Sequence, residues 1–139
     1  MSTVAEIRQE LRLPAQPSHL GTAREFADDV ARSWGFDEEG RYQFAFAANE
    51  AVTNAIEHGL PCEDGTIRLR VAEEREALSL YVHDCGSFAP RPSQPRGLGE
   101  RGRGLALMAM MMDEVELKPD TAGTVLRLSK RRTPGAAAA

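Results

Sequence analysis

An alanine-rich stretch from Phe44 to Gly59 constrains the fold of this chain more than any other feature. Its apolar residues recur at the spacing of one helix face, and a glycine follows the run. The pattern predicts a long helix that packs along one side and is capped by Gly59. The apolar stripe consists of Phe44, Ala47, Ala51 and Ala55.

A polar row follows the same helical period and is formed by Glu50, Asn54 and either Glu57 or His58. Such a row beside small apolar residues is costly unless it meets a ligand, finds partners or lies in solvent. The helix alone therefore leaves two interpretations open, a binding face and a solvated face. For His58 we favour a terminal residue near the negative end of the helix dipole over a catalyst.

Length and composition fit one domain of ordinary globular character, with 139 residues, 42% hydrophobic and 27% charged. The formal net charge of −4 argues against nucleic acid as a direct partner. No run approaches the roughly 18 apolar residues that a membrane span requires. The first residues lack the apolar core of a secretory signal, so we expect a cytoplasmic protein that has no membrane partner.

The two cysteines, Cys62 and Cys85, are not paired by any sequence pattern, which favours a reduced protein. Together with His19, His58 and His83 they show no metal-ligand spacing, so we expect no zinc site.

The remaining elements are predicted from periodicity and turn residues. Residues 5–13 fit either a strand or a short helix, of which we favour an edge strand. Residues 19–33 indicate a helix with Ser18 as its N-cap. Asp37 is expected to cap the long helix. Alternation over 66–72 and 77–84 predicts an antiparallel hairpin. The rest is expected as an apolar, Met-rich helix over 105–112 and strands over 114–118 and 124–129.

Residues 85–103 break all periodicity and are rich in glycine, proline and arginine. A long basic loop in a compact domain suits a polyanion, although a disordered surface loop has the same composition. Gly97 to Gly102 formally matches the dinucleotide fingerprint G-x-G-x-x-G. Because a proline-rich segment and not a strand precedes it, we set that interpretation aside.

The segments on either side of this loop suggest a nucleotide site. Asp84 ends a strand and is followed by Gly86, so its carboxylate can accept from an adenine amino group while the glycine lets a flat ring approach. Residues 101–105 open the apolar helix. Glycines there expose backbone N–H groups, and the helix dipole favours phosphate.

The polar row of the long helix supplies matching chemistry. Asn54 offers a neutral oxygen to Mg²⁺, a hard cation that prefers oxygen ligands. Glu50, one turn earlier, can orient or deprotonate a hydroxyl nucleophile.

Together these segments resemble the motif boxes of one superfamily. Residues 50–59, 84–86, 102–105 and 123–125 occur in the order of the N, G1 and G2 boxes and the final strand of the GHKL (Bergerat-fold) ATP-binding superfamily. Within it the chain is similar to anti-sigma factor serine/threonine kinases of the RsbW/SpoIIAB type, over residues 5 to 130.

The resemblance implies an α+β fold, a two-layer sandwich with a mixed, mostly antiparallel sheet and helices on one face. Residues 1–130 would form a single ATPase/kinase-like domain, followed by a flexible tail at 131–139. It implies an ATP- and Mg²⁺-dependent kinase that phosphorylates a STAS-domain anti-anti-sigma protein, sequesters a sigma factor and forms a homodimer.

By the same resemblance Glu50 would be the general base and Asn54 the Mg²⁺ ligand. Asp84 and Gly86 would hold adenine, with Thr124 behind Asp84. The residues expected around the phosphates are Arg101, Gly102, Arg103, Gly104 and Leu105.

One position departs from the family pattern. The second glycine expected in the G1 box is replaced by Phe88, which predicts a stiffer and more apolar start of the loop. The alternative to a kinase is therefore a regulatory module that binds ATP and acts only by holding its partner.

Overall fold

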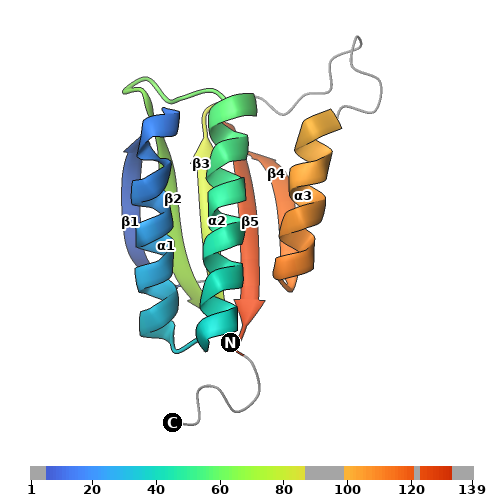
Figure 1. Cartoon of the computed structure of the whole chain (residues 1–139). Coiled ribbons are helices and arrows are strands. Elements are labelled where there is room, and N and C mark those ends of the chain that lie inside the picture. The colour runs from blue at the N-terminus through green and yellow to red at the C-terminus, as the bar shows by residue number, and fades with distance from the viewer. Residues whose placement is uncertain (1–5, 87–98, 121–122, 133–139) are drawn as a thin grey trace.

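Five antiparallel strands form one sheet in the computed structural model, which describes residues 6–86, 99–120 and 123–132 (Figure 1). For 6–8, 99–103 and 120 it describes the backbone only. The strand order is β1-β2-β3-β5-β4. The bounds are β1 Glu6–Pro14, β2 Thr66–Glu74, β3 Ala77–Asp84, β4 Glu114–Asp120 and β5 Gly123–Arg131. Every neighbouring pair is antiparallel, so among the described strands the sheet is antiparallel throughout and not mixed.

The helices cover one face of this sheet and leave the other open (Figure 1). They are the short 3-10 helix η1 Pro17–His19, and α1 Leu20–Trp34, α2 Glu38–His58 and α3 Gly99–Met111. The expected two-layer α+β architecture is thereby confirmed. Among the described residues no helix has the length and apolarity needed to cross a membrane.

Helix α2 lies at the centre of the helical layer, between α1 and α3 (Figure 1). Its start is fixed as expected, because the Asp37 carboxylate accepts a hydrogen bond from the Gly40 N–H at 2.7 Å. Acidic Glu38 and Glu39 occupy the first turn, where the helix dipole favours negative charge. Half of the buried residues of this helix are alanines, and such small side chains allow the helix to lie close to the sheet.

The core between the two layers follows the alternation of the strands. Residues that point toward the helices are fully or almost fully buried: Ile67, Leu69, Val71, Leu80, Val82, Leu126 and Leu128. Met108 of α3 (Gly99–Met111) and Met112, which directly follows it, are also buried, as expected for adaptable core residues, whereas Met110 is 76% exposed.

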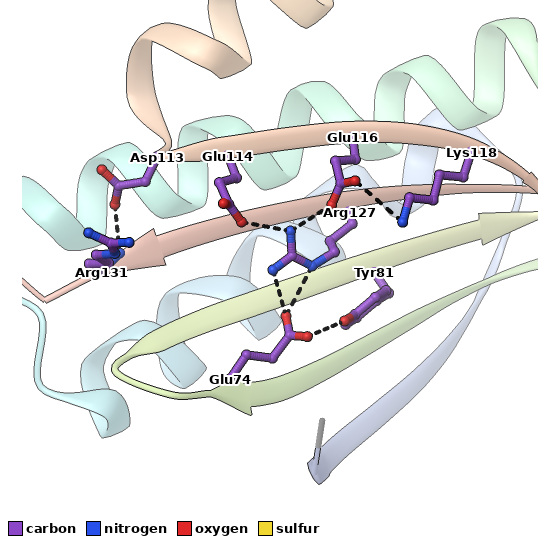
Figure 2. Close-up of polar contacts among 8 residues, drawn as sticks. All are labelled: Glu74, Tyr81, Asp113, Glu114, Glu116, Lys118, Arg127 and Arg131. Atoms are coloured by element: carbon purple, nitrogen blue, oxygen red, sulfur yellow. Dashed lines mark hydrogen bonds and ion pairs between the residues drawn. The ribbon is translucent and has the colours of Figure 1, made fainter. Parts of the chain in front are cut away.

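The open face of the sheet is polar and is organised by Arg127 (Figure 2). Its guanidinium lies 2.9 Å from both Glu114 and Glu116 on β4 and 3.0 Å from Glu74 on β2. The Tyr81 hydroxyl donates to the same Glu74 carboxylate at 2.7 Å. One arginine thus connects charged side chains of three strands.

Several boundaries differ from the sequence prediction, and β2 and β4 each end two residues later than expected, at Glu74 and Asp120. Helix α3 begins at Gly99 and not at Leu105. Gly99, Gly102 and Gly104 therefore lie within its first two turns. Strand β5 continues to Arg131, two residues beyond the expected end, because pairing with β3 extends to Ala77. Residues 121–122, most of the basic loop (87–98) and the tail beyond 132 lie outside the described residues.

Acid should weaken this fold partly through Glu74. Burial on its own raises the pKa of Glu74, but hydrogen bonds, including one from Tyr81, and the Arg127 charge outweigh it and leave the pKa below its ordinary 4.5. A carboxyl with a lowered folded-state pKa stabilises the fold above its unfolded pKa, and this contribution is lost as pH falls through the folded value.

We therefore expect Glu74→Gln to be less stable than the parent at neutral pH and to lose less stability below about pH 4.5. Urea unfolding from roughly pH 6 to pH 3.5 measures the difference. Glu76→Gln, in the exposed turn next to it, is the control and should follow the parent. Parallel pH profiles for the parent and Glu74→Gln would contradict the assignment.

Candidate functional site

The carboxylate of Asp84 lies where β3 ends and meets the C-terminal end of α2. Its Oδ1 accepts hydrogen bonds from the Gly86 N–H at 2.8 Å and from the Leu60 N–H at 3.4 Å. Only 4% of Asp84 is exposed. A buried carboxylate needs donors, and here backbone groups from two separate segments supply them.

Thr124 stands directly opposite Asp84 in the register of β3 and β5. Its hydroxyl donates to the Gly86 carbonyl at 2.8 Å, and its side chain is 3% exposed. The expectation that Thr124 lies behind Asp84 fits this position, although the hydroxyl contacts Gly86 and not the carboxylate itself. The three residues form one connected group.

Glycines are required around this group because backbones approach it closely. A Cβ added at Gly59 would lie 2.5 Å from Asp84 Cγ, and one at Gly86 would lie 2.9 Å from the Leu60 nitrogen. Gly123 has φ +150° and lies against the carbonyl of Asp84. Gly59 has an extended backbone, with φ −90°, which any residue can adopt. A glycine is needed here because Asp84 approaches closely, and not because the helix ends in a left-handed cap.

Of the polar pair on α2, Asn54 lies toward the end that meets Asp84, and Glu50 lies one turn further toward the middle of the helix. Asn54 is 7% exposed and Glu50 is partly buried. Asn54 precedes Gly59 by five residues, or about 7 Å of helix rise, and Gly59 touches Asp84. Asn54 and Asp84 therefore do not lie on opposite sides of the molecule. The next polar residues, Glu57 and His58, are exposed.

The residues expected around the phosphates all lie in the first two turns of α3. Gly104 and Leu105 are partly buried, and for Arg101, Gly102 and Arg103 the structure gives only the helical backbone. Helix α3 packs beside α2 (Figure 1). Phe88 and the loop arginines before residue 99 fall outside the described residues.

Two hollows among the described residues lie away from this group. A cavity of about 480 Å³ is lined by the β2–β3 turn and by Arg127, Ser129 and Arg131. It borders Ala77, at the opposite end of β3 from Asp84, about 23 Å along the strand. The candidate site is recognised by the chemistry of its side chains. Residues 87–98, which follow Gly86, are not among those described.

The cysteines correct the sequence interpretation. Cys62 and Cys85 form a disulfide, with their Cα atoms 5.0 Å apart. The expectation of a reduced pair is wrong for this structure, because the loop after α2 and the end of β3 come together. His83 lies nearby, with its ligand atom and both sulfurs within 4.8 Å of one another. A metal needs both thiolates, so it and the disulfide exclude each other.

Sequence reasoning missed Leu60, whose N–H holds Asp84 and whose carbonyl accepts from the Cys85 N–H at 2.9 Å. It also missed the disulfide. One usable signal existed for both. Each cysteine closely follows a predicted site residue: Cys62 comes three residues after Gly59, and Cys85 comes one residue after Asp84.

Comparison with known proteins agrees with this geometry. The family model described as a histidine kinase-like ATPase domain matches residues 13–130. The serine-protein kinase RsbW of Bacillus pumilus is 31% identical over 131 residues, which cover 84% of this chain and 81% of that protein. This chain belongs to the RsbW family of serine-protein kinases.

Two further comparisons describe the extent of the similarity. RsbW of Bacillus subtilis is 29% identical to this RsbW-family chain over 129 residues, covering 84% of this chain and 81% of that protein. The crystal structure of the RsbU and RsbW domains of a Mycobacterium tuberculosis protein superposes with a TM-score of 0.67 at 22% identity. It covers 89% of this chain and 32% of that longer chain, and supports the fold.

In this RsbW-family chain, Thr124→Val should lower the free energy of unfolding by about 1–3 kcal/mol, because it removes the donor to the buried Gly86 carbonyl. Urea unfolding measures the change. Thr124→Ser keeps the hydroxyl and is the matched control, which should retain most of the lost stability. Equal destabilisation by both variants would show that the methyl group and not the hydrogen bond matters.

Proposed function

We propose that this chain is an ATP-dependent protein serine/threonine kinase that acts as an anti-sigma factor. The observation that carries the proposal is the buried Asp84 carboxylate at the end of β3. It lies against Gly59, which directly follows the helix that bears Glu50 and Asn54. The match to a histidine kinase-like ATPase domain supports ATP as its nucleotide.

Asp84, Gly86 and Thr124 are proposed to hold the adenine end of ATP. Two backbone N–H groups fix the Asp84 carboxylate, so its orientation does not depend on a ligand. A fixed carboxylate is a preorganised acceptor for an exocyclic amino group. The Thr124 hydroxyl keeps the Gly86 backbone in place behind it.

Asn54 and Glu50 are proposed to serve the phosphate end. They lie one turn apart on α2, so their side chains share one side of the helix. A buried amide oxygen fits a hard cation such as Mg²⁺, which neutralises phosphate charge when bound. Glu50, partly exposed, can accept the proton of a substrate hydroxyl.

The first turns of α3 are proposed to contact the phosphates. The helix begins at Gly99, so its unpaired backbone N–H groups belong to the first four residues, with the dipole behind them. Arg101 and Arg103 supply positive charge, and Gly102, Gly104 and Leu105 complete the segment. This placement differs from the sequence expectation, because the N–H groups of Gly104 and Leu105 fall inside the helical hydrogen-bond pattern and only the first four residues offer theirs to a phosphate.

The proposed substrate is a serine or threonine of a STAS-domain anti-anti-sigma protein, and the proposed second partner is a sigma factor. We further propose a homodimer, a cytoplasmic location and a single domain over residues 1–130. The support is the family membership of the chain and the names of its relatives, which are serine-protein kinases.

A binding module without kinase activity is the second candidate, because Phe88 replaces a glycine in the G1 pattern. The two candidates differ in one outcome. A kinase labels a STAS partner from γ-labelled ATP, whereas the module binds ATP and labels nothing.

Glu50→Gln should reduce the rate of phosphoryl transfer to a STAS partner by about 10²–10⁴-fold, because amide replaces the proposed base. ATP binding should stay close to that of the parent. Glu57→Gln, on an exposed position of the same helix, is the matched control and should keep the parental rate. Labelling by Glu50→Gln at the parental rate would remove Glu50 from this role.

Asn54→Ala should abolish the Mg²⁺-dependent part of ATP binding, because it deletes the proposed oxygen ligand. Calorimetry of ATP binding with Mg²⁺ and with excess EDTA measures that part directly. Circular dichroism confirms that the variant is folded, since Asn54 is buried. Unchanged affinity in Mg²⁺ would exclude Asn54 as a metal ligand.

A further inference from the structure

The disulfide joins the two segments that hold Asp84. Cys62 belongs to the connection after α2, and its N–H and carbonyl bond to Thr66 and Gly65 at 2.9 and 2.8 Å. Cys85 directly follows Asp84. The covalent link therefore connects the segment after α2 to the end of β3, across a sequence separation of 23 residues.

The donors to the Asp84 carboxylate come from both of these segments. Leu60, two residues before Cys62, supplies one N–H, and Gly86, one residue after Cys85, supplies the other. The bond at Leu60 is the longer of the two, at 3.4 Å against 2.8 Å. The longer bond, from Leu60 to Asp84, depends on how these two segments are placed relative to each other. The disulfide holds the same two segments together.

Both cysteines are placed where thiol chemistry can occur. Neither residue is fully buried, since each is partly exposed. The imidazole of His83 lies within 4.8 Å of both. Thiolate is the attacking form in thiol–disulfide exchange, and an imidazole nitrogen is a group that can take up a thiol proton.

We propose that Cys62 and Cys85 are a reversible thiol–disulfide pair that sets the affinity of the adjacent site for ATP. This inference rests on the proposed function, since it regulates the nucleotide site at Asp84. The oxidised form is the tighter-binding form, because the disulfide keeps the Leu60 segment against Asp84.

The proposed oxidant is a low-molecular-weight disulfide. The thiolate of one cysteine attacks a sulfur of that reagent, forms a mixed disulfide and releases one thiolate. The second cysteine attacks the protein sulfur of the mixed disulfide, closes the Cys62–Cys85 bond and releases the second thiolate. The reagent gains two electrons, and the two protons lost by the cysteines pass to the released thiolates.

Reduction removes the covalent link but leaves the Cys85–Leu60 backbone hydrogen bond to hold the segments. The Leu60 segment then occupies the arrangement seen here for only part of the time. Apparent affinity falls in proportion to that fraction, and we expect an ATP dissociation constant about three- to tenfold higher in the reduced form.

The test is calorimetry of ATP with Mg²⁺ on the full chain, after oxidised glutathione and again after reduced glutathione. Peptide mass spectrometry measures the fraction of Cys62–Cys85 disulfide in each sample. We expect interconversion of the two forms and weaker binding after reduction. The variant carrying Cys62→Ser and Cys85→Ser should bind like the reduced parent in both conditions, with its fold checked by circular dichroism.

Four outcomes would overturn the inference. Equal ATP affinity of the oxidised and reduced parent would remove the switch and leave the proposed function intact, whereas no ATP binding by either form would remove the proposed function and the switch with it. If the chain is folded but glutathione can neither reduce the disulfide nor re-form it, the two cysteines are not a reversible pair. Zinc bound to reduced Cys62, His83 and Cys85 at one ion per chain, so that re-oxidation stops, would assign these residues to a metal instead.

Discussion

The hydrogen bonds to the Asp84 carboxylate determine how the helical layer meets the sheet at the candidate site. A carboxylate that is 4% exposed is costly unless donors surround it, and its donors come from Leu60 after α2 and Gly86 after β3. These contacts fix the end of α2 against the end of β3. Gly59 makes the contact possible, because any Cβ there would overlap the carboxylate.

The two faces of the sheet specify its register together. The apolar face accepts the alanines of α2, and the open face places Arg127 opposite Tyr81 on β3 and Glu116 on β4. Because side chains alternate along a strand, a shift of one residue would turn both sets toward the wrong side. The register in turn places Thr124 opposite Asp84.

Periodicity was sufficient to predict most of the fold. The long helix with its Asp37 cap, the hairpin and the edge strand were confirmed, because each depends on local spacing or on a single capping contact. The start of α3 was placed too late. Glycines weaken a local helix signal, yet packing beside α2 carries the helix back to Gly99.

The features that could not be predicted from the sequence depend on long-range contacts. Gly59 was interpreted as a helix cap, and its close contact with Asp84 depends on how α2 crosses the sheet. The Cys62–Cys85 bond depends on the same crossing, since 23 residues separate the sulfurs along the chain. The roles of Glu50, Asn54 and the α3 residues stay predictions.

The candidate site is therefore built from two parts that depend on different contacts. Glu50 and Asn54 keep their spacing as long as one turn of α2 is intact. The Gly86 N–H bond to Asp84 is local, but the Leu60 N–H bond forms only while two distant segments stay together. A covalent link between those segments acts on the second part and leaves the first unchanged. Control through Cys62 and Cys85 thus fits a change in nucleotide affinity better than a change in the chemical step.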